Sequence, residues 1–342
     1  MKKQIWIFLF IAIGLVIVLL TLSSFFLFYF PNTKTYSEDK FFKITKGQSF
    51  SEIAGNLKER GIIRDDFSLK IAAKITGRES QIIARNYFFS GGLTNNEILD
   101  ILTNPSYFQT TRLRIPEGFT IRQIAKVAED RFSIPQKDFI AETKNPKYIK
   151  ELNLEGKIKN LEGFLFPDTY IVDINTDAKD LVKTLFDEFK KQVLQNSGMM
   201  QKMGADKTNI LNVVTLASII EAETYLKNEL EIISGVYHNR LQKNMKLEAD
   251  PTVQYALPDG PKERLLFSDL KIDSPYNTYK NTGLPPGPIN NPGFDAIKAA
   301  LNPAKHNFLF FVATGEGGHK FSETYDQHLK AAQEYRKKID AK

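Results

Sequence analysis

The feature that most restricts how this chain can fold is an uncharged run, Gln4–Phe30, near its N-terminus. Its first part, Ile5–Leu22, is almost wholly apolar, and a helix of about 20 such residues crosses a bilayer. A cleaved signal peptide would have a shorter apolar core and a small-x-small cleavage site. Here bulky aromatic residues follow, and Ser23 and Ser24 form the lone small pair. The sequence therefore predicts an uncleaved, single-pass membrane anchor.

The charges beside this run predict its orientation. Lys2 and Lys3 lie on the short N-terminal side, and basic residues next to a membrane helix favour the cytoplasmic side. Residues after about 31 should then lie outside, since no later segment is long and apolar enough to span again. The chain as a whole is 42% hydrophobic and 25% charged, which is typical of a globular protein.

The composition argues against several classes of site. The chain has no cysteine, so neither disulfides nor thiolate metal sites can form. Its four histidines lack metal-ligand spacing, and no P-loop, dinucleotide fingerprint or G-x-S-x-G elbow is present. The net charge of +6 comes mainly from scattered lysines rather than a basic run typical of nucleic-acid binding. We therefore expect no metal, no cofactor and no nucleic-acid partner.

Two stretches, 44–54 and 115–125, match each other without gaps at an offset of 71 residues. Each is typical of a strand end, a glycine turn, a capping hydroxyl and an amphipathic helix. The expected capping boxes are Ser49 with Glu52 and Thr120 with Gln123. These stretches resemble LysM-type modules, which implies binding to N-acetylglucosamine-containing glycans such as peptidoglycan. The alternative is a small domain that only spaces the rest of the chain from the membrane. We expect the second copy to pack onto its neighbour.

A glutamate on the apolar face of a helix is the strongest candidate for a catalytic group. Residues 208–224 lack Pro and Gly and show helical apolar spacing. At about 100° per residue, Glu221 lies about 20° from Ile210, inside the apolar stripe, whereas Glu223 points away toward water or a rim. An apolar surface raises the pKa of a carboxyl group toward neutrality, so that it can donate a proton near pH 7. The alternative is a buried glutamate neutralised by a cation.

An arginine on the next predicted helix bears on that alternative. Arg240 falls within the apolar arc of 229–241, and an inward-facing arginine needs a carboxylate or several carbonyls as partners. Its candidate carboxylates are Glu221, Glu248 and Asp250. Pairing with Glu221 would lower the pKa of that carboxyl and weaken a catalytic role, whereas pairing with Asp250 would leave the pKa raised. The sequence leaves both pairings open.

Two later segments carry polar groups suited to a sugar. Asp250 precedes a turn and a helix, where it either caps the helix or contacts substrate. The loop 274–288 is stiffened by prolines and turned by glycines. Such a loop can hold Asn277 and Tyr279 at fixed positions to hydrogen-bond and stack on a sugar.

These motifs together look like those of the endolytic murein transglycosylase (YceG-like) family. The resemblance runs from the anchor to the C-terminus. It is carried by 161–170, A-S-I-I-E-A-E-T at 217–224, N-R-L at 239–241, D-P-T-V at 250–253, S-P-Y-N-T-Y at 274–279, G-L-P-P-G at 283–287 and G-G-H at 317–319. It implies a bacterial enzyme that cuts nascent peptidoglycan within the glycan strand. The family's catalytic acid maps onto Glu221, with ordinary variation at Ala222.

The resemblance implies a lyase, a lytic transglycosylase that breaks the MurNAc–GlcNAc bond without adding water. Neutral Glu221 would protonate the leaving oxygen, and the resulting carboxylate would deprotonate the C6 hydroxyl of the same muramic acid, which closes a 1,6-anhydro ring. One carboxyl group can play both parts. Residues expected to contact the sugar or support the site are Glu162, Asp168, Arg240, Asp250, Gln254, Asn277 and Tyr279.

The predicted architecture is α+β. Its expected parts are a cytoplasmic stub and transmembrane anchor (1–30), a linker (31–40), a LysM-like domain (41–110), a second LysM-like segment packed on the catalytic region (111–158) and a transglycosylase domain (159–342). The resemblance places the chain in the bacterial cytoplasmic (inner) membrane, with the catalytic domain on the outer side. Expected partners are peptidoglycan glycan strands and the membrane, with peptidoglycan synthases as candidates.

Two other functions compete with this one. The first is a muramidase-type hydrolase, in which Glu221 works with a second carboxylate, Asp250 or Glu162, that directs water. The second is a non-catalytic wall-binding scaffold, in which the LysM-like modules do the work.

Overall fold

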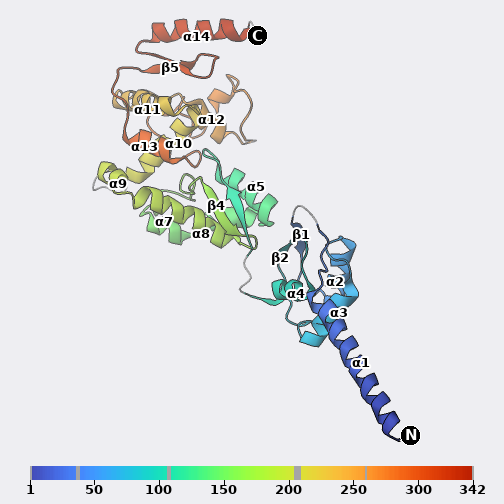
Figure 1. The fold of residues 1–342 in the computed structure, drawn as a ribbon. Helices are drawn as coiled ribbons and strands as arrows, with labels where there is room; N and C mark the ends of the chain where they lie inside the picture. The colour runs from blue at the N-terminus through green and yellow to red at the C-terminus, as the bar shows by residue number, and fades with distance from the viewer. Residues whose placement is uncertain (1, 36–38, 106–108, 204–208, 259, 341–342) are drawn as a thin grey trace. The chain divides into compact units, whose positions relative to one another are not determined.

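The computed structural model describes residues 2–35, 39–105, 109–203, 209–258 and 260–340. The chain divides into two compact units, Met1–Thr111 with Ile171–Asn175 and Arg112–Tyr170 with Thr176–Lys342. Helices predominate in both, and the strands within the described ranges pair in three two-stranded sheets (Figure 1). The predicted mixed α+β architecture is confirmed.

The first unit begins with α1 (Lys2–Tyr29). Among the described residues it is the one helix long and apolar enough to cross a membrane. The qualifying stretch, Phe10–Tyr29, has a mean hydropathy of 2.7. This criterion considers only the length and the composition of a helix. α1 is therefore consistent with the predicted anchor, but the criterion does not indicate its orientation in a membrane. Near the end of α1, Leu27 and Phe28 pack against the core of the first unit.

The rest of the first unit is a strand–helix–helix–strand arrangement with one added helix. Its elements are β1 (Lys40–Lys43), α2 (Phe50–Glu59), α3 (Asp66–Thr76), β2 (Asn86–Phe89) and α4 (Asn95–Thr103). β1 and β2 are antiparallel, with Phe42 opposite Tyr87 in the core. The predicted capping box starts α2, because Ser49 and Glu52 each accept a hydrogen bond from the other's backbone N–H. Whether this unit binds glycan as a LysM module would stays a prediction.

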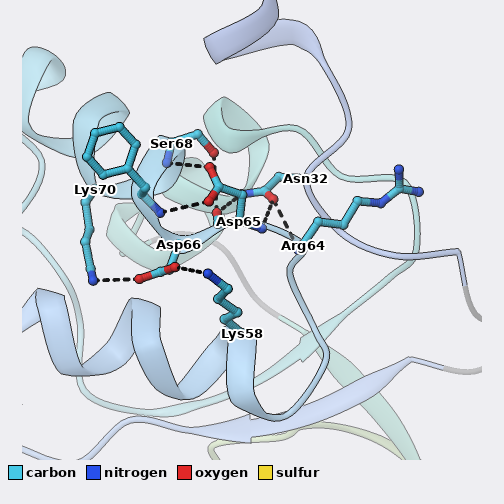
Figure 2. A network of polar contacts seen from close by, with 8 residues as sticks. Asn32, Lys58, Arg64, Asp65, Asp66, Ser68 and Lys70 are labelled. Carbon is cyan, nitrogen blue, oxygen red and sulfur yellow. Dashed lines mark hydrogen bonds and ion pairs between the residues drawn. The ribbon is translucent and has the colours of Figure 1, made fainter.

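The beginning of the segment predicted as a linker (31–40) is built into the first unit. Asn32 is buried, and its Oδ1 accepts hydrogen bonds from the backbone N–H groups of Arg64 and Asp65 (Figure 2). Its amide nitrogen donates to the carbonyl of Asp65 and to Oδ1 of Asn95, both at 2.7 Å. A buried amide needs all of these partners. Asn32 and the buried Thr33 therefore belong to the folded unit, which corrects the linker prediction at these positions.

The second copy of the repeated motif opens the first helix of the second unit. α5 (Ile121–Phe132) starts with the predicted capping box of Thr120 and Gln123. It is followed by α6 (Gln136–Glu142) and α7 (Pro146–Glu151). β3 (Thr110–Arg114) pairs with β4 (Thr169–Asp173), and the division between the units falls inside these two strands.

The remainder of the second unit is mainly helical. α8 (Ala178–Phe189) continues into a π-helical turn (Lys190–Leu194) and is followed by α9 (Ser197–Met203), α10 (Ile210–Glu223), α11 (Lys227–Gln242) and α12 (Asp250–Ala256). After a short 3-10 turn (Asp269–Lys271) and the proline-rich loop, α13 (Phe294–Leu301) packs against α10 and α11. β5 (Phe310–Ala313) and β6 (His319–Ser322) form an antiparallel pair that α14 (Tyr325–Asp340) covers (Figure 1).

Candidate active site

The helix that carries Glu221 is buried on all sides rather than along one stripe. α11, α12 and α13 all contact α10. Its buried residues include the predicted stripe and the positions between, namely Ile210, Val213, Val214, Thr215, Leu216, Ala217, Ser218, Ile219 and Ile220. The predicted helix start at Thr208 lies outside the described residues. Glu221 is half-buried in the last turn, where the helix emerges from this core.

The carboxyl group of Glu221 reaches the start of α13. Its Oε2 accepts a 2.9 Å hydrogen bond from the backbone N–H of Gly293, the residue that caps α13. Gly118 also lies against it, because a Cβ at that glycine would sit 3.6 Å from Cγ of Glu221. With a φ of +75°, Gly118 adopts a backbone conformation that suits glycine. Two glycines from distant parts of the second unit thus contact this side chain, Gly293 at the carboxyl group and Gly118 at the methylene beside it.

Burial raises the pKa of Glu221 to about 7. The hydrogen bond from Gly293 opposes this rise, as does the positive charge of Lys227. The negative charges of Glu117 and Asp295 reinforce it, because they disfavour a further charge nearby. Glu221 therefore has the property expected of a proton donor near neutral pH.

A cavity of about 740 Å³ lies in the second unit next to the end of α10, and its lining includes the neighbours of Glu221 rather than Glu221 itself. Gly118, which touches Glu221, and Ala222, which follows it, both line the cavity. The cavity wall also contains polar groups, namely Thr120, Arg122, Gln123, Lys144, Asn160, Glu162, Glu223, Asp250, Gln254, Tyr255 and Asn290. Its size and its mixture of apolar and polar walls suit a ligand-binding pocket.

Glu162 forms part of the cavity wall and is only 6% exposed. Its Oε1 accepts from the backbone N–H of Ile121 at 2.8 Å and from Nδ2 of Asn291 at 3.1 Å. The hydroxyl of Tyr255 donates to Oε2 at 3.4 Å. Burial raises the pKa of Glu162 to about 7, against the effect of these hydrogen bonds. The carboxyl thereby connects three segments of the wall.

Glu223 lies at the cavity wall, as a side chain expected to meet water or a rim can, but it also has a partner that the sequence did not reveal. It is half-buried in the cavity wall, and the hydroxyl of Tyr237 donates to its Oε1 at 2.5 Å. Burial raises the pKa of Glu223 to about 7; the Tyr237 hydrogen bond and the charge of Arg240 lower it, while Asp250 raises it. The helical period of α10 does not reveal Tyr237, which α11 contributes.

Arg240 pairs with neither of the two carboxylates left open by the sequence. Its Nη1 lies 3.1 Å from Oε2 of Glu248, the third candidate. The guanidinium also donates through Nε to the carbonyl of Leu309 and through Nη1 to the carbonyls of Lys246 and Leu247. Because this inward-facing cation is satisfied elsewhere, it does not neutralise Glu221. Its contacts stabilise the end of α11 rather than the cavity.

Asp250 and Tyr279 bind each other. Of the two roles considered for Asp250, helix capping is not found, because α12 begins at Asp250 itself, Ala249 is the N-cap residue, and no side chain caps it. The hydroxyl of Tyr279 instead donates to Oδ1 of Asp250 at 2.6 Å. Asp250 lines the cavity, and so does Gln254, whose side chain binds the backbone of Lys262 through both its amide atoms.

Asn277 and Asp168 are not placed to contact a ligand in this cavity. Asn277 is fully buried, and its amide donates to the carbonyls of Leu270 and Ile272 while its Oδ1 accepts from the N–H of Tyr279. All of its bonds therefore shape its own loop, which corrects its prediction as a sugar contact. Asp168 is exposed, is not part of the cavity wall, and accepts from the backbone N–H of Thr169.

Sequence reasoning missed two asparagines that follow the proline-rich loop. Asn291 is buried, and its Oδ1 accepts from the N–H groups of Gly163 and Leu165. Asn290 lines the cavity and donates to the carbonyl of Ser218. Within the described part of the chain, no hydrogen bond reaches the buried Oδ1 of Asn290. The signal in the sequence was an Asn-Asn pair flanked by Pro288 and Pro292.

Comparisons with known proteins show which family the chain belongs to. The profile of the YceG-like family matches residues 42–334. A protein named endolytic murein transglycosylase from Bacillus subtilis (strain 168) is 35% identical over 305 residues, which cover 85% of this chain and 83% of that protein. One of the same name from Streptococcus pneumoniae (strain D39) is 26% identical, and the match covers 83% of this chain but 56% of that longer protein.

Among solved structures, the crystal structure of a YceG-like protein from Listeria monocytogenes is similar to this chain. The two share 30% sequence identity with a TM-score of 0.58. The match covers 86% of this chain and 99% of the Listeria chain.

Proposed function

Because the chain belongs to the YceG-like family, we propose that it is an endolytic murein transglycosylase, a lyase that cuts the glycan strands of peptidoglycan. The names of its relatives support this activity, and the second unit supplies a cavity with a proton donor beside it. The observation that carries the proposal is the half-buried carboxyl of Glu221, whose pKa is raised to about 7 by burial.

We propose that Glu221 acts alone, first as an acid and then as a base. The neutral carboxyl protonates the oxygen that leaves as the bond between MurNAc and GlcNAc breaks, while positive charge develops at C1 of MurNAc. The carboxylate that remains takes the proton of the C6 hydroxyl of that MurNAc. Its oxygen then bonds to C1 and closes the 1,6-anhydro ring. Protons balance, because the one that Glu221 gives up is replaced by the one from C6.

The rival hydrolase needs a second carboxylate that is free to direct water. Glu162 is buried among Ile121, Asn291 and Tyr255, and Asp250 accepts a hydrogen bond from Tyr279. These bonds favour a supporting role for both carboxylates. They therefore support the single-carboxyl course over a muramidase.

Sugar contacts come from the polar wall of the cavity. The buried Oδ1 of Asn290 is a hydrogen-bond acceptor that a sugar hydroxyl or an N-acetyl N–H would satisfy. Gln254 and Tyr279 are further candidates, since Gln254 lines the cavity and Tyr279 holds Asp250 in its wall. Glu162 supports the wall from behind.

We further propose that α1 anchors the protein in the bacterial cytoplasmic membrane, with Lys2 and Lys3 inside and both units on the outer side. This position brings the catalytic unit close to newly made glycan strands. Contact between the first unit and glycan, as in LysM modules, belongs to the same proposal, and peptidoglycan synthases are candidate partners.

The test is mass spectrometry of isolated peptidoglycan digested by the full chain. We expect 1,6-anhydro-MurNAc ends inside the strands. Reducing MurNAc ends would contradict the transglycosylase and favour the muramidase. Binding of glycan without any cleavage would favour the scaffold.

The role of Glu221 is tested by Glu221→Gln. We expect cleavage to be lost while the unfolding midpoint changes little, because a neutral amide replaces an acid whose neutral form is favoured by burial. The matched control is Glu155→Gln, since Glu155 is an exposed residue of the same unit outside the cavity wall, and it should retain activity. Cleavage that persists in Glu221→Gln would exclude this residue as the acid.

A further inference from the structure

The helix α3 has two apolar faces, and only one of them belongs to the core of the first unit. Leu69, Ala72 and Ala73 are buried against that core. On the other side, Phe67 is 67% exposed and Ile75 is 65% exposed. These two residues are eight positions apart, with Ile71 midway, so all three lie on one side of the helix. A surface helix of a globular protein ordinarily has a single apolar face.

The outward stripe of α3 faces the same space as α1. A cavity of about 580 Å³ is lined by Leu19, Leu22 and Phe26 of α1 together with Phe67 and Ile71 of α3. The cavity wall is mostly apolar, but Arg64 also contributes to it. α3 therefore lies beside residues that belong to the candidate membrane span.

The part of α1 that enters the bilayer determines the level of this cavity. Because Leu27 and Phe28 pack against the core of the first unit, we place the span at Ile5–Leu22, the N-terminal part of the apolar run, rather than at the whole of Phe10–Tyr29. This segment would be about 27 Å long at about 1.5 Å per residue, close to the roughly 30 Å of a bilayer's hydrocarbon core. Leu19 and Leu22 then lie at the outer edge of that core. Phe67 and Ile71, which share the cavity with them, lie at the boundary between acyl chains and headgroups.

The connection between α1 and the rest of the unit is fixed by hydrogen bonds. Nδ2 of Asn95 donates to the carbonyl of Leu27 at 2.8 Å, and Asn32 donates to Asn95 in turn. Leu27 and Phe28 pack on the core. Insertion of α1 therefore brings α3 to the membrane surface with its outward stripe, rather than leaving the unit on a free tether.

Charge near the stripe favours anionic lipid. Asp66 forms ion pairs with both Lys58 and Lys70 (Figure 2). Asp65 caps α3 by accepting hydrogen bonds from the N–H groups of Phe67 and Ser68. Both acidic side chains therefore have partners within the first unit. Arg64 and Lys74 are exposed, and no ion pair to either is found among the described residues. Figure 2 shows the Arg64 guanidinium extending away from this network. A basic group beside an apolar stripe is typical of helices that lie in a membrane interface.

We propose that α3 is an interfacial membrane-binding helix, whose stripe of Phe67, Ile71 and Ile75 enters the outer leaflet. The acyl chain of an anionic phospholipid fills the cavity between α3 and α1, and its phosphate lies at Arg64. This inference rests on the proposed anchoring by α1 and goes beyond it, because it fixes how the first unit sits on the bilayer.

The experiment uses tryptophan fluorescence of the full chain in vesicles of phosphatidylglycerol and phosphatidylcholine brominated on its acyl chains. Trp6 is the single tryptophan of the chain and reports whether α1 is inserted. The Trp6→Phe variant then receives Phe67→Trp or, as a matched control, Phe41→Trp. Phe41 is 47% exposed on β1 of the same unit and does not line the cavity.

We expect quenching at position 67 comparable with that of Trp6, and much weaker quenching at position 41. If Trp6 is quenched while a tryptophan at position 67 is quenched as weakly as one at position 41, the proposal of an interfacial helix is overturned, whereas anchoring by α1 is supported. An unquenched Trp6 would overturn both. A blue-shifted but unquenched tryptophan at 67 would mean that protein, such as a second copy of the chain, covers the stripe instead.

The proposed binding of an anionic headgroup is tested separately with the double variant Arg64→Glu, Lys74→Glu. The two substitutions should reduce quenching at position 67 in vesicles that contain phosphatidylglycerol and have little effect in purely zwitterionic vesicles. An equal effect in both compositions would contradict recognition of an anionic headgroup.

Discussion

The backbone N–H of Gly293 donates to Oε2 of Glu221, and this hydrogen bond joins the last turn of α10 to the first turn of α13. An N–H group can only donate, so Oε2 must act as the acceptor whether the carboxyl is charged or neutral. A carbonyl oxygen accepts a hydrogen bond better than a hydroxyl oxygen does, so this bond favours the neutral form with its proton on Oε1. Among the described residues, no hydrogen bond to Oε1 is found.

Glu162→Gln should change how stability depends on pH. The pKa of Glu162 is raised to about 7 by burial, so the stability of its neutral form is fully present below about pH 4.5 and is lost as pH rises through about 7. This loss amounts to about 3 kcal/mol for a shift of this size. Glutamine cannot ionise, and its Oε1 can still accept from Ile121. The free energy of unfolding of the variant, taken relative to that of the wild type, should therefore be higher at pH 8 than at pH 5. Urea unfolding of both proteins at both pH values measures this difference, and the same difference at pH 5 and pH 8 would refute the prediction.

Arg240→Lys should destabilise the second unit without altering the pH dependence of cleavage. Lysine cannot reach the carbonyls of Lys246, Leu247 and Leu309 as the guanidinium does. The carbonyl of Leu247 is buried and the other two are partly buried, so their loss of a partner should reduce stability by about 2 kcal/mol in total. The control is Glu248→Gln, which removes a partner that is 47% exposed and should reduce stability by about 1 kcal/mol or less. Thermal unfolding distinguishes the two variants. A shifted pH profile in Arg240→Lys would show that this cation does act on Glu221.

Asn277→Ala should lower stability by about 2 kcal/mol, because the carbonyls of Leu270 and Ile272 and the N–H of Tyr279 lose their partner. Tyr279→Phe removes only the donor to Asp250, which is exposed, and should have a smaller effect. Unfolding midpoints and KM are measured for both. A rise in KM for Asn277→Ala at unchanged stability would restore the sugar contact that the sequence predicted.

The place of Glu221 on a largely buried helix could be predicted from the sequence, because helical geometry and side-chain polarity both depend on nearby residues. The capping boxes at Ser49 and Thr120 were predictable for the same reason. The environment of Glu221 was not, since Gly118 and Gly293 are about a hundred and about seventy residues away along the chain. The partner of Glu223 could not be predicted for the same reason, because Tyr237 comes from another helix.

Asp250 and Asn277 show a second limit. Both have side chains that suit several partners, so the local pattern left Asp250 as a cap or a substrate contact and indicated a sugar contact for Asn277. The fold instead assigns Asp250 to Tyr279 and Asn277 to its own loop. The hydrogen-bond partners of polar side chains in loops depend on which backbone groups the tertiary structure leaves without a partner.

The most direct test of the central claim is the pH profile of kcat/KM for glycan cleavage, measured side by side for the wild type and Glu117→Gln. Glu221 must be protonated to act, so wild-type activity should fall as pH rises through about 7. Glu117 helps to raise the pKa of Glu221, so its neutral replacement should move this fall to lower pH. A fall that occurs at the same pH in both proteins, or activity that persists undiminished well above pH 7, would contradict Glu221 as the proton donor.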